Sequence, residues 1–289
     1  SLTTADKKKS YRRIKGIPVL LERAEIFFAE SYILYGKHLI ENEQLINQLD
    51  KIDDDSVSRQ EYKNNFTKGL RENQRILKDI LEQLDDFFCK KNLLQVFLSG
   101  RFSSFEYLKA FRYLKRDWSN LPECEVQVNT ICNSIKLQMQ KINCKGSALF
   151  LGAGLGRIAW ELESFFQEVL LTDKDFSTAY LYDKIVSGET ISFYEMNPAN
   201  IAFVNDVSNK LSASLANIGY KDVNRIKRKM KYFISDVISL PLKDTSINSI
   251  FSIYFTDVLP LEKYYKEVNR VLKSGGFFVH FGPLGYPFS

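Results

Sequence analysis

The spacing of apolar residues along the chain changes near residue 145. Before that point, long stretches repeat apolar residues every three and four positions, which is typical of amphipathic helices. The clearest stretches are residues 20–49, 69–98 and 103–119, and the polar, acidic segment DKIDDDSVSRQ separates the first two. The pattern predicts an all-helical N-terminal domain over residues 1–145.

After residue 145 the chain alternates short apolar runs with helix-like segments. Expected strands are residues 148–151, 168–172, 231–234, 249–255 and 276–281, and expected helices are 157–166, 200–218 and 261–272. Such alternation predicts the α/β class, here a Rossmann-like, mainly parallel sheet with five readable strands over residues 146–289. In such sheets ligands bind at the carboxyl ends of the strands.

A glycine-rich turn follows the first expected strand, in SALFLGAGLGRIAWEL. Gly152, Gly154 and Gly156 allow the backbone to turn sharply and a ligand to approach it, because glycine has no Cβ. An ordinary turn between a strand and a helix would have the same composition, so the turn alone leaves the ligand open.

Acidic residues follow three of the expected strands. Asp175, with Asp173 as the alternative, could accept hydrogen bonds from ribose hydroxyls. Asp236 could accept from an adenine amino group, and Asp257 follows the next strand. Each aspartate could instead cap a helix, which is the commoner role at such a position.

Composition excludes several classes of protein. No apolar run approaches the length that spans a bilayer, and no membrane association is expected. Two histidines make a histidine-rich metal site implausible, so no metal is expected. The four cysteines lack metal-type spacing and predict reduced thiols in a cytoplasmic or also nuclear protein.

The net charge of +5 includes one basic run, RIKRKMK at residues 225–231. This run could contact phosphates, but a solvated basic face is the simpler interpretation. Aromatic residues are not interleaved with it as in single-strand binders, so a nucleic-acid partner is not expected.

Together these motifs resemble the carnosine N-methyltransferase (N2227-like) family of class I S-adenosylmethionine-dependent methyltransferases. The resemblance rests on LGAGLGRIAWEL, DFS at 175–177, SD at 235–236, FTD at 255–257, GPLGY at 282–286, NQRIL at 73–77 and RDWS at 116–119. It implies S-adenosylmethionine as cofactor. The implied cofactor-binding residues are Arg116, Gly152, Gly154, Gly156, Asp175, Asp236, Val237 and Ile253.

On the substrate side, the resemblance implies that Asp257 is the catalytic, substrate-binding carboxylate and that Tyr286 also binds substrate. The chain departs from the family at Tyr113, where the family has Gln, at DVLP in place of DTAHN, and at Pro287 in place of a substrate His. The implied reaction is methylation of an imidazole in carnosine, a related dipeptide or a peptidyl histidine. Methylation of RNA or another acceptor, and a non-catalytic cofactor-binding scaffold, are the alternatives.

The last expected strand runs almost to Ser289, and its outer edge would present unpaired backbone groups beside Phe277, Val279 and Phe281. We expect that edge to be covered, either by residues beyond Ser289 or by a second subunit in a homodimer.

Overall fold

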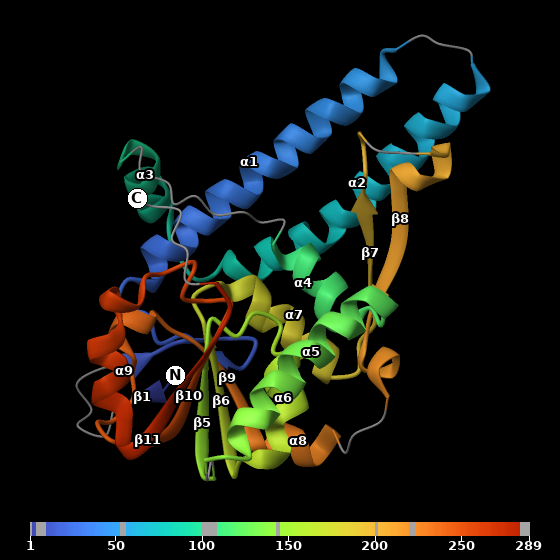
Figure 1. Cartoon of the computed structure of the whole chain (residues 1–289). Coiled ribbons are helices and arrows are strands. Elements are labelled where there is room, and N and C mark those ends of the chain that lie inside the picture. Colours follow the sequence, from blue (N-terminus) through green and yellow to red (C-terminus); the bar gives the residue numbers. More distant parts are fainter. Residues whose placement is uncertain are drawn as a thin grey trace. The chain divides into compact units, whose positions relative to one another are not determined.

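The computed structural model describes residues 2–3, 10–52, 56–99, 109–142, 145–199, 202–219 and 223–283 (Figure 1). The chain forms two compact units. The sheet unit comprises Ser1–Glu22, Tyr113–Glu189 and Ser214–Ser289, and the helical unit comprises Arg23–Arg112 and Thr190–Ala213. This division differs from the boundary expected at residue 145, because the first 22 residues and residues 113–145 group with the sheet.

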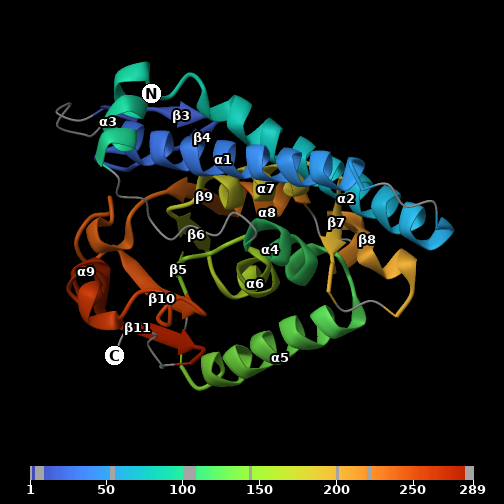
Figure 2. The same ribbon diagram turned by 90° about the horizontal axis from the view of Figure 1, so that it is seen from above.

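The sheet unit contains a parallel sheet of five strands in the order β11-β10-β5-β6-β9, which Figure 2 shows from above. Its strands are β5 (Ser147–Leu151), β6 (Glu168–Asp173), β9 (Met230–Ile234), β10 (Ile247–Ile253) and β11 (Leu272–Phe281). All five strands expected from the sequence are present, and the predicted fold class is confirmed.

Helices cover both faces of this sheet. In Figure 2, α9 lies on one side of the sheet and α5 and α6 lie on the other. The helices are α5 (Pro122–Met139), α6 (Arg157–Leu162), α7 (Phe176–Val186), α8 (Val223–Lys229) and α9 (Tyr265–Val271). The expected helices at 157–166 and 261–272 begin or end in 3-10 turns, at Glu163–Phe165 and Leu261–Lys263, and α7 was not expected.

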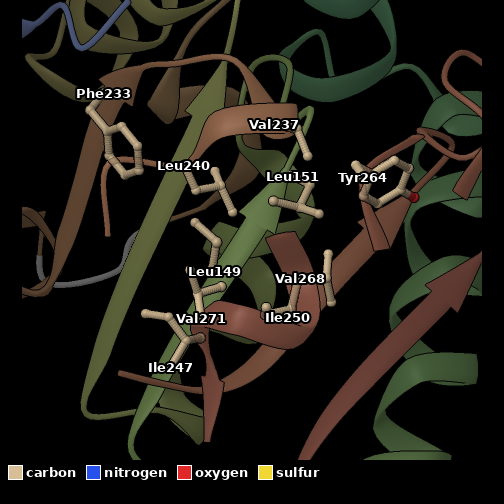
Figure 3. Packing of buried hydrophobic residues seen from close by; sticks show 10 residues of the cluster. All are labelled: Leu149, Leu151, Phe233, Val237, Leu240, Ile247, Ile250, Tyr264, Val268 and Val271. Atoms are coloured by element: carbon tan, nitrogen blue, oxygen red, sulfur yellow. The ribbon is translucent and has the colours of Figure 1, made fainter. Parts of the chain in front are cut away.

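Alternate residues of β5 supply two cores. Leu149 and Leu151 belong to a cluster with Val268 and Val271 of α9 (Figure 3). Phe150 points to the other face, because successive side chains of a strand alternate. There its ring stacks on Phe251 with the centroids 4.6 Å apart.

The first residues form short strands, which corrects the expectation of an all-helical N-terminal half. These are β1 (Leu2–Thr3), β2 (Ser10–Tyr11), β3 (Arg13–Ile14) and β4 (Ile17–Pro18). Val19 forms a parallel bridge to Ile234 of β9, and Leu20 N donates to Ile234 O over 2.7 Å. This segment is therefore recruited to the sheet by a strand more than 200 residues away, which local periodicity cannot reveal.

The helical unit consists of long helices and one hairpin. The helices are α1 (Ala24–Asp50), α2 (Val57–Leu84) and α3 (Lys90–Ser99), and α4 (Lys109–Trp118) crosses the boundary between the units. The expected helix at 69–98 is divided at residues 85–89 into α2 and α3. The strands are β7 (Ile191–Met196) and β8 (Ser208–Ala213), which pair antiparallel.

The helix expected over residues 200–218 is wrong. In its place the described residues form a 3-10 turn at Val204–Val207, β8, and a second 3-10 turn at Leu215–Ile218. The pairing with β7 supplies the hydrogen bonds that a helix would have made internally. Tertiary pairing therefore overrides the local pattern.

Helix α2 is built to fit this hairpin closely. The Asn73 amide donates to Tyr194 O and accepts from Tyr194 N, both over 2.8 Å. A Cβ on Gly69 would lie 2.6 Å from Met196 Sδ and 2.9 Å from Ser208 Cβ. The absence of that Cβ lets the helix and the strands approach each other.

Strand β11 stands at the end of the strand order and pairs with β10 alone among the described residues. Phe277, Val279 and Phe281 are half-buried, and β11 also contacts α5. Coverage of the outer edge by a further segment stays a prediction. No helix in the described ranges is long and apolar enough to cross a membrane.

Candidate functional site

The glycine turn lies between β5 and α6, at the carboxyl end of the central strand. Gly152, Gly154 and Gly156 have φ of +54°, +53° and +73°, a region that side chains with a Cβ rarely adopt. A Cβ on Gly152 would lie 2.2 Å from the Phe255 ring, whereas the nearest atoms to one on Gly154 belong to the Tyr113 ring, at an ordinary contact distance of 3.7 Å. The turn is therefore closely packed at Gly152 and open above Gly154.

Neighbouring strands hold this turn in place. Ala153 N donates to Thr172 O over 3.0 Å, and Gly154 N donates to Asp173 Oδ2 over 3.1 Å. On the other side, the Tyr232 hydroxyl donates to Gly154 O over 2.7 Å. The backbone at Gly154 is thus fixed at both its polar groups.

The RDWS segment at the end of α4 packs directly on the turn. Trp118 Nε1 donates to Leu155 O over 3.0 Å, and its ring meets Trp160 of α6 edge-on at 5.9 Å. Trp118 O in turn accepts from Ser214 N over 3.1 Å. Trp118 is completely buried, so the shared occurrence of RDWS and GRIAWEL reflects one packed structure.

The buried side chain of Arg157 connects α4, α5 and α6 through hydrogen bonds. Its guanidinium forms a two-pronged ion pair with Glu125 of α5, at 3.0 and 2.9 Å, and donates to Asp117 O over 2.6 Å. Nε donates to Glu161 over 3.1 Å, and the side chain is 4% exposed. With these donors engaged, Arg157 is a structural residue of the site.

A cavity of about 70 Å³ opens beside the turn. Its lining includes four residues expected from the sequence to bind cofactor: Arg116, Gly152, Gly154 and Ile253. Tyr113 and Tyr254 line it as well. The structure therefore brings together four of the eight expected cofactor-binding residues, whereas Gly156, Asp175, Asp236 and Val237 are not in the lining of this cavity.

Arg116 is both paired and part of the cavity wall. Its Nε and Nη2 donate to Asp117 at 2.5 and 3.0 Å, and its guanidinium lies 5.1 Å from the centre of the Tyr113 ring. Burial alone would lower the pKa of Arg116, but the Asp117 carboxylate outweighs it and the net shift is upward. Asp117 is 1% exposed and the Arg116 side chain 22%, so this partly buried ion pair holds a permanent cation at the cavity.

The side chain of Tyr113 is half-buried and lines the cavity. Burial, reinforced by the nearby Asp173 carboxylate, raises the pKa of its phenol. The phenol therefore stays a neutral hydrogen-bond donor at physiological pH.

The expected ribose-binding aspartate also caps a helix. Asp175 is the N-cap of α7, and its carboxylate accepts from Ser177 N over 2.9 Å and from Ser177 Oγ over 2.7 Å. Asp173, the alternative, accepts from Gly154 N and Asp175 N, each over 3.1 Å. Both carboxylates are oriented by the backbone; the ribose role of Asp175 stays a prediction.

Asp236 and Val237 follow β9. Asp236 caps a 3-10 turn by accepting from Ile238 N over 3.2 Å, and its other oxygen pairs with Lys174 at 2.9 Å. Val237 is 5% exposed and packs in the core cluster of Figure 3. Contact of this pair with adenine also stays a prediction.

Unlike Asp175 and Asp236, Asp257 caps no helix or 3-10 turn among the described residues. The next 3-10 turn has Pro260 as its N-cap, without a side-chain hydrogen bond. Asp257 Oδ1 is buried and has no hydrogen-bond partner among the described residues. A buried carboxylate oxygen without a donor is costly, so it is a ready acceptor for a ligand N–H.

Sequence reasoning missed Tyr254. It stands directly after β10 with φ of +50°, which is strained for a residue with a Cβ, and it lines the cavity. Its N donates to Phe281 O over 2.8 Å. No sequence signal distinguishes it from the apolar strand residues before it.

Two further features named from the sequence are Tyr286 and the basic run at residues 225–231. Tyr286 lies outside the described residues. In the basic run, Lys229 pairs with Glu163 at 3.1 Å and Lys231 with Glu168 at 2.6 Å, so these lysines are partly neutralised. No cluster of metal-binding side chains occurs in the parts of the chain that the structure describes.

Comparisons with solved structures give distant similarities. The YcgJ protein from Bacillus subtilis is 18% identical, covers 51% of this chain and 49% of its own, and has a TM-score of 0.36. The PH0226 protein from Pyrococcus horikoshii is 19% identical, with 62% and 66% covered and a TM-score of 0.40. A SAM-dependent methyltransferase of the DUF858 family from Leishmania major is 13% identical, with 60% and 59% covered and a TM-score of 0.38.

This chain thus spans about half to two thirds of the length of those structures. No curated protein matches it in sequence. The family model described as carnosine N-methyltransferase matches residues 101–289, which include RDWS, the glycine turn and Asp257. Because this match covers more than half of the chain, the protein belongs to the carnosine N-methyltransferase family.

Proposed function

We propose that the protein is an S-adenosylmethionine-dependent N-methyltransferase that methylates an imidazole nitrogen. The proposed acceptor is carnosine, a related histidine dipeptide or a peptidyl histidine. Family membership supports this proposal, and the buried, unpaired Oδ1 of Asp257 carries it.

The residues around the glycine turn fit the cofactor. Arg116 offers a cation for a carboxylate, and the backbone over Gly154 is open to a close approach. Asp175 and Asp236 offer carboxylates for ribose and adenine, and Val237 and Ile253 offer apolar side chains. When bound, S-adenosylmethionine supplies an electrophilic methyl group on a sulfonium.

Asp257 would act on the acceptor. A neutral imidazole has one N–H and one nucleophilic nitrogen, and a carboxylate that accepts the N–H fixes which nitrogen is nucleophilic. The same carboxylate stabilises the positive charge that develops on the ring during methyl transfer. Positioning and charge stabilisation are the main contributions a protein can make to this displacement.

The test is methyl transfer from labelled cofactor to a panel of acceptors. The panel contains carnosine, other histidine dipeptides, a histidine-containing peptide, RNA and a dipeptide with phenylalanine in place of histidine. We expect transfer only to the imidazole compounds. Transfer to RNA alone, or to none of the panel while the cofactor binds, would overturn the proposal; the second result would favour a cofactor-binding scaffold.

Asp257→Asn separates the role of this carboxylate from cofactor binding. We expect kcat/KM to fall roughly 10- to 100-fold, as for a lost hydrogen bond to a charged group, with unchanged cofactor affinity. Asp244→Asn is the matched control, because that carboxylate belongs to the same unit and is 73% exposed. Equal kcat/KM in both variants would contradict the assignment.

A further inference from the structure

A chain of hydrogen bonds runs from the buried Thr256, the residue before Asp257, to the half-buried His280. Thr256 Oγ1 lies 2.7 Å from Ser252 Oγ, 2.9 Å from the Tyr264 hydroxyl and 3.1 Å from His280 Nδ1. His280 Nε2 lies 3.0 Å from Gly282 O. Ser252, Thr256 and Tyr264 are each at most 1% exposed, so these groups have no access to bulk water.

The carbonyl oxygen of Gly282 determines which group donates in each hydrogen bond of this chain. Gly282 O can only accept, so Nε2 of His280 must carry the proton in that contact. In the neutral ring, Nδ1 is then an acceptor, and the Thr256 hydroxyl must donate to it. Thr256 keeps its lone pairs for the hydroxyl hydrogens of Ser252 and Tyr264, so every donor in the chain has an acceptor.

This chain of hydrogen bonds connects the residue before Asp257 with the end of β11. Thr256 immediately precedes Asp257, and Gly282 follows the last residue of β11. Tyr264 anchors the other end, because its ring belongs to the core cluster while its oxygen points away from it (Figure 3). Movement of His280 would therefore change the position of Thr256 relative to the core.

We propose that His280 is a positioning residue: as the neutral Nε2–H tautomer it holds Thr256, and through Thr256 it orients the Asp257 carboxylate toward the acceptor. The orientation matters because Asp257 Oδ1 has no hydrogen-bond partner of its own in the described chain. The position of the backbone between Thr256 and Asp257 therefore determines the orientation of the Asp257 carboxylate. The catalytic part of this inference rests on the proposed function.

The tautomer can be tested without any activity. The chain has only two histidines, so the ¹⁵N-imidazole NMR spectrum of the whole protein has two sets of ring signals, and His38→Gln assigns them. We expect a protonated Nε2 and an unprotonated, hydrogen-bonded Nδ1 for His280. A His280 signal from the Nδ1–H tautomer, or one that Thr256→Val leaves unchanged, would overturn the proposal.

Two substitutions of His280 separate its two contacts. The Asn amide oxygen can occupy the place of Nδ1, so His280→Asn keeps an acceptor for Thr256. The Gln amide nitrogen can reach the place of Nε2, so His280→Gln keeps only the donor to Gly282. If positioning acts through Thr256, His280→Gln and Thr256→Val should raise KM for the acceptor roughly three- to tenfold, whereas His280→Asn and Thr256→Ser should stay near the wild type.

Cofactor affinity should be equal in all these variants, which distinguishes a positioning role from general destabilisation. His38→Gln is the matched control for the histidine substitution, because His38 lies on α1 and outside this chain of hydrogen bonds. Equal KM in His280→Asn and His280→Gln would overturn the kinetic role. If the wild-type protein methylates no imidazole, the proposed function fails, while the NMR result still decides the tautomer and its contact with Thr256.

Discussion

The indole nitrogen of Trp118 donates a hydrogen bond to the carbonyl oxygen of Leu155 over 3.0 Å. This bond joins the last turn of α4 to the glycine turn, 37 positions later in the chain. The bond therefore fixes the RDWS segment, whose Arg116 lines the candidate cofactor cavity.

Trp118→Phe should weaken cofactor binding. The substitution keeps an aromatic ring against Trp160 but removes the N–H, so Leu155 O loses its donor. We expect a loss of about 1 kcal/mol in unfolding free energy and a severalfold weaker cofactor affinity. Denaturant unfolding and titration calorimetry measure the two effects, and unchanged affinity would show that the turn does not depend on this bond.

Gly152→Ala should mainly reduce stability, whereas Gly154→Ala should mainly reduce cofactor affinity. Both residues have positive φ, so each substitution carries a cost of about 1–2 kcal/mol. Only Gly152→Ala also forces its Cβ into the Phe255 ring, at 2.2 Å, and it should therefore lose clearly more stability. Gly154→Ala should mainly reduce cofactor affinity, because its Cβ would enter the open space above the turn. Equal stability losses in unfolding experiments would argue against the packing difference.

Gly69→Ala should destabilise the helical unit. The new Cβ would lie 2.9 Å from Ser208 Cβ, which has no flexible end that can move aside. Overpacking of this kind costs about 1–3 kcal/mol. Gly36→Ala in α1 is the matched control, because nothing lies within 4 Å of its Cβ, and it should stabilise the helix by about 0.5–1 kcal/mol. The same sign of change in both variants, measured by thermal unfolding, would contradict the prediction.

Glu267 should make stability depend on acidic pH. Its pKa is lowered below the ordinary 4.5, first by hydrogen bonds from Arg270, and it also accepts from Leu240 N over 2.7 Å. A lowered folded-state pKa stabilises the protein above pH 4.5, and this stability is lost as the pH falls through the folded pKa.

Glu267→Gln should therefore reduce the unfolding free energy by about 1–2 kcal/mol at pH 7, and the difference from the wild type should shrink toward pH 3. Urea unfolding of both proteins between pH 3 and pH 7 measures this difference in unfolding free energy. Glu262→Gln, the same change on an exposed glutamate nearby, should leave the pH dependence as it is. A constant difference between Glu267→Gln and the wild type at every pH would refute the linkage.

The sequence alone determined the five strands of the parallel sheet and the position of the turn. The five strands of the sheet, the glycine turn and the long N-terminal helices follow from local periodicity and from the backbone demands of Gly152–Gly156, which act within a few residues. The motifs also singled out Arg116, which lines the cavity, and Asp257, whose role toward an acceptor stays a prediction.

Only the tertiary structure decided which distant segments complete these elements. The 3-10 turn Val204–Val207 and strand β8 form because β7 and α2 supply their partners. Val19 joins the sheet unit through Ile234, and His280 meets Thr256 only where β10 and β11 run side by side. A hydrogen bond or a packed contact between residues far apart in sequence leaves no local periodicity, because its energy appears only when the chain has folded.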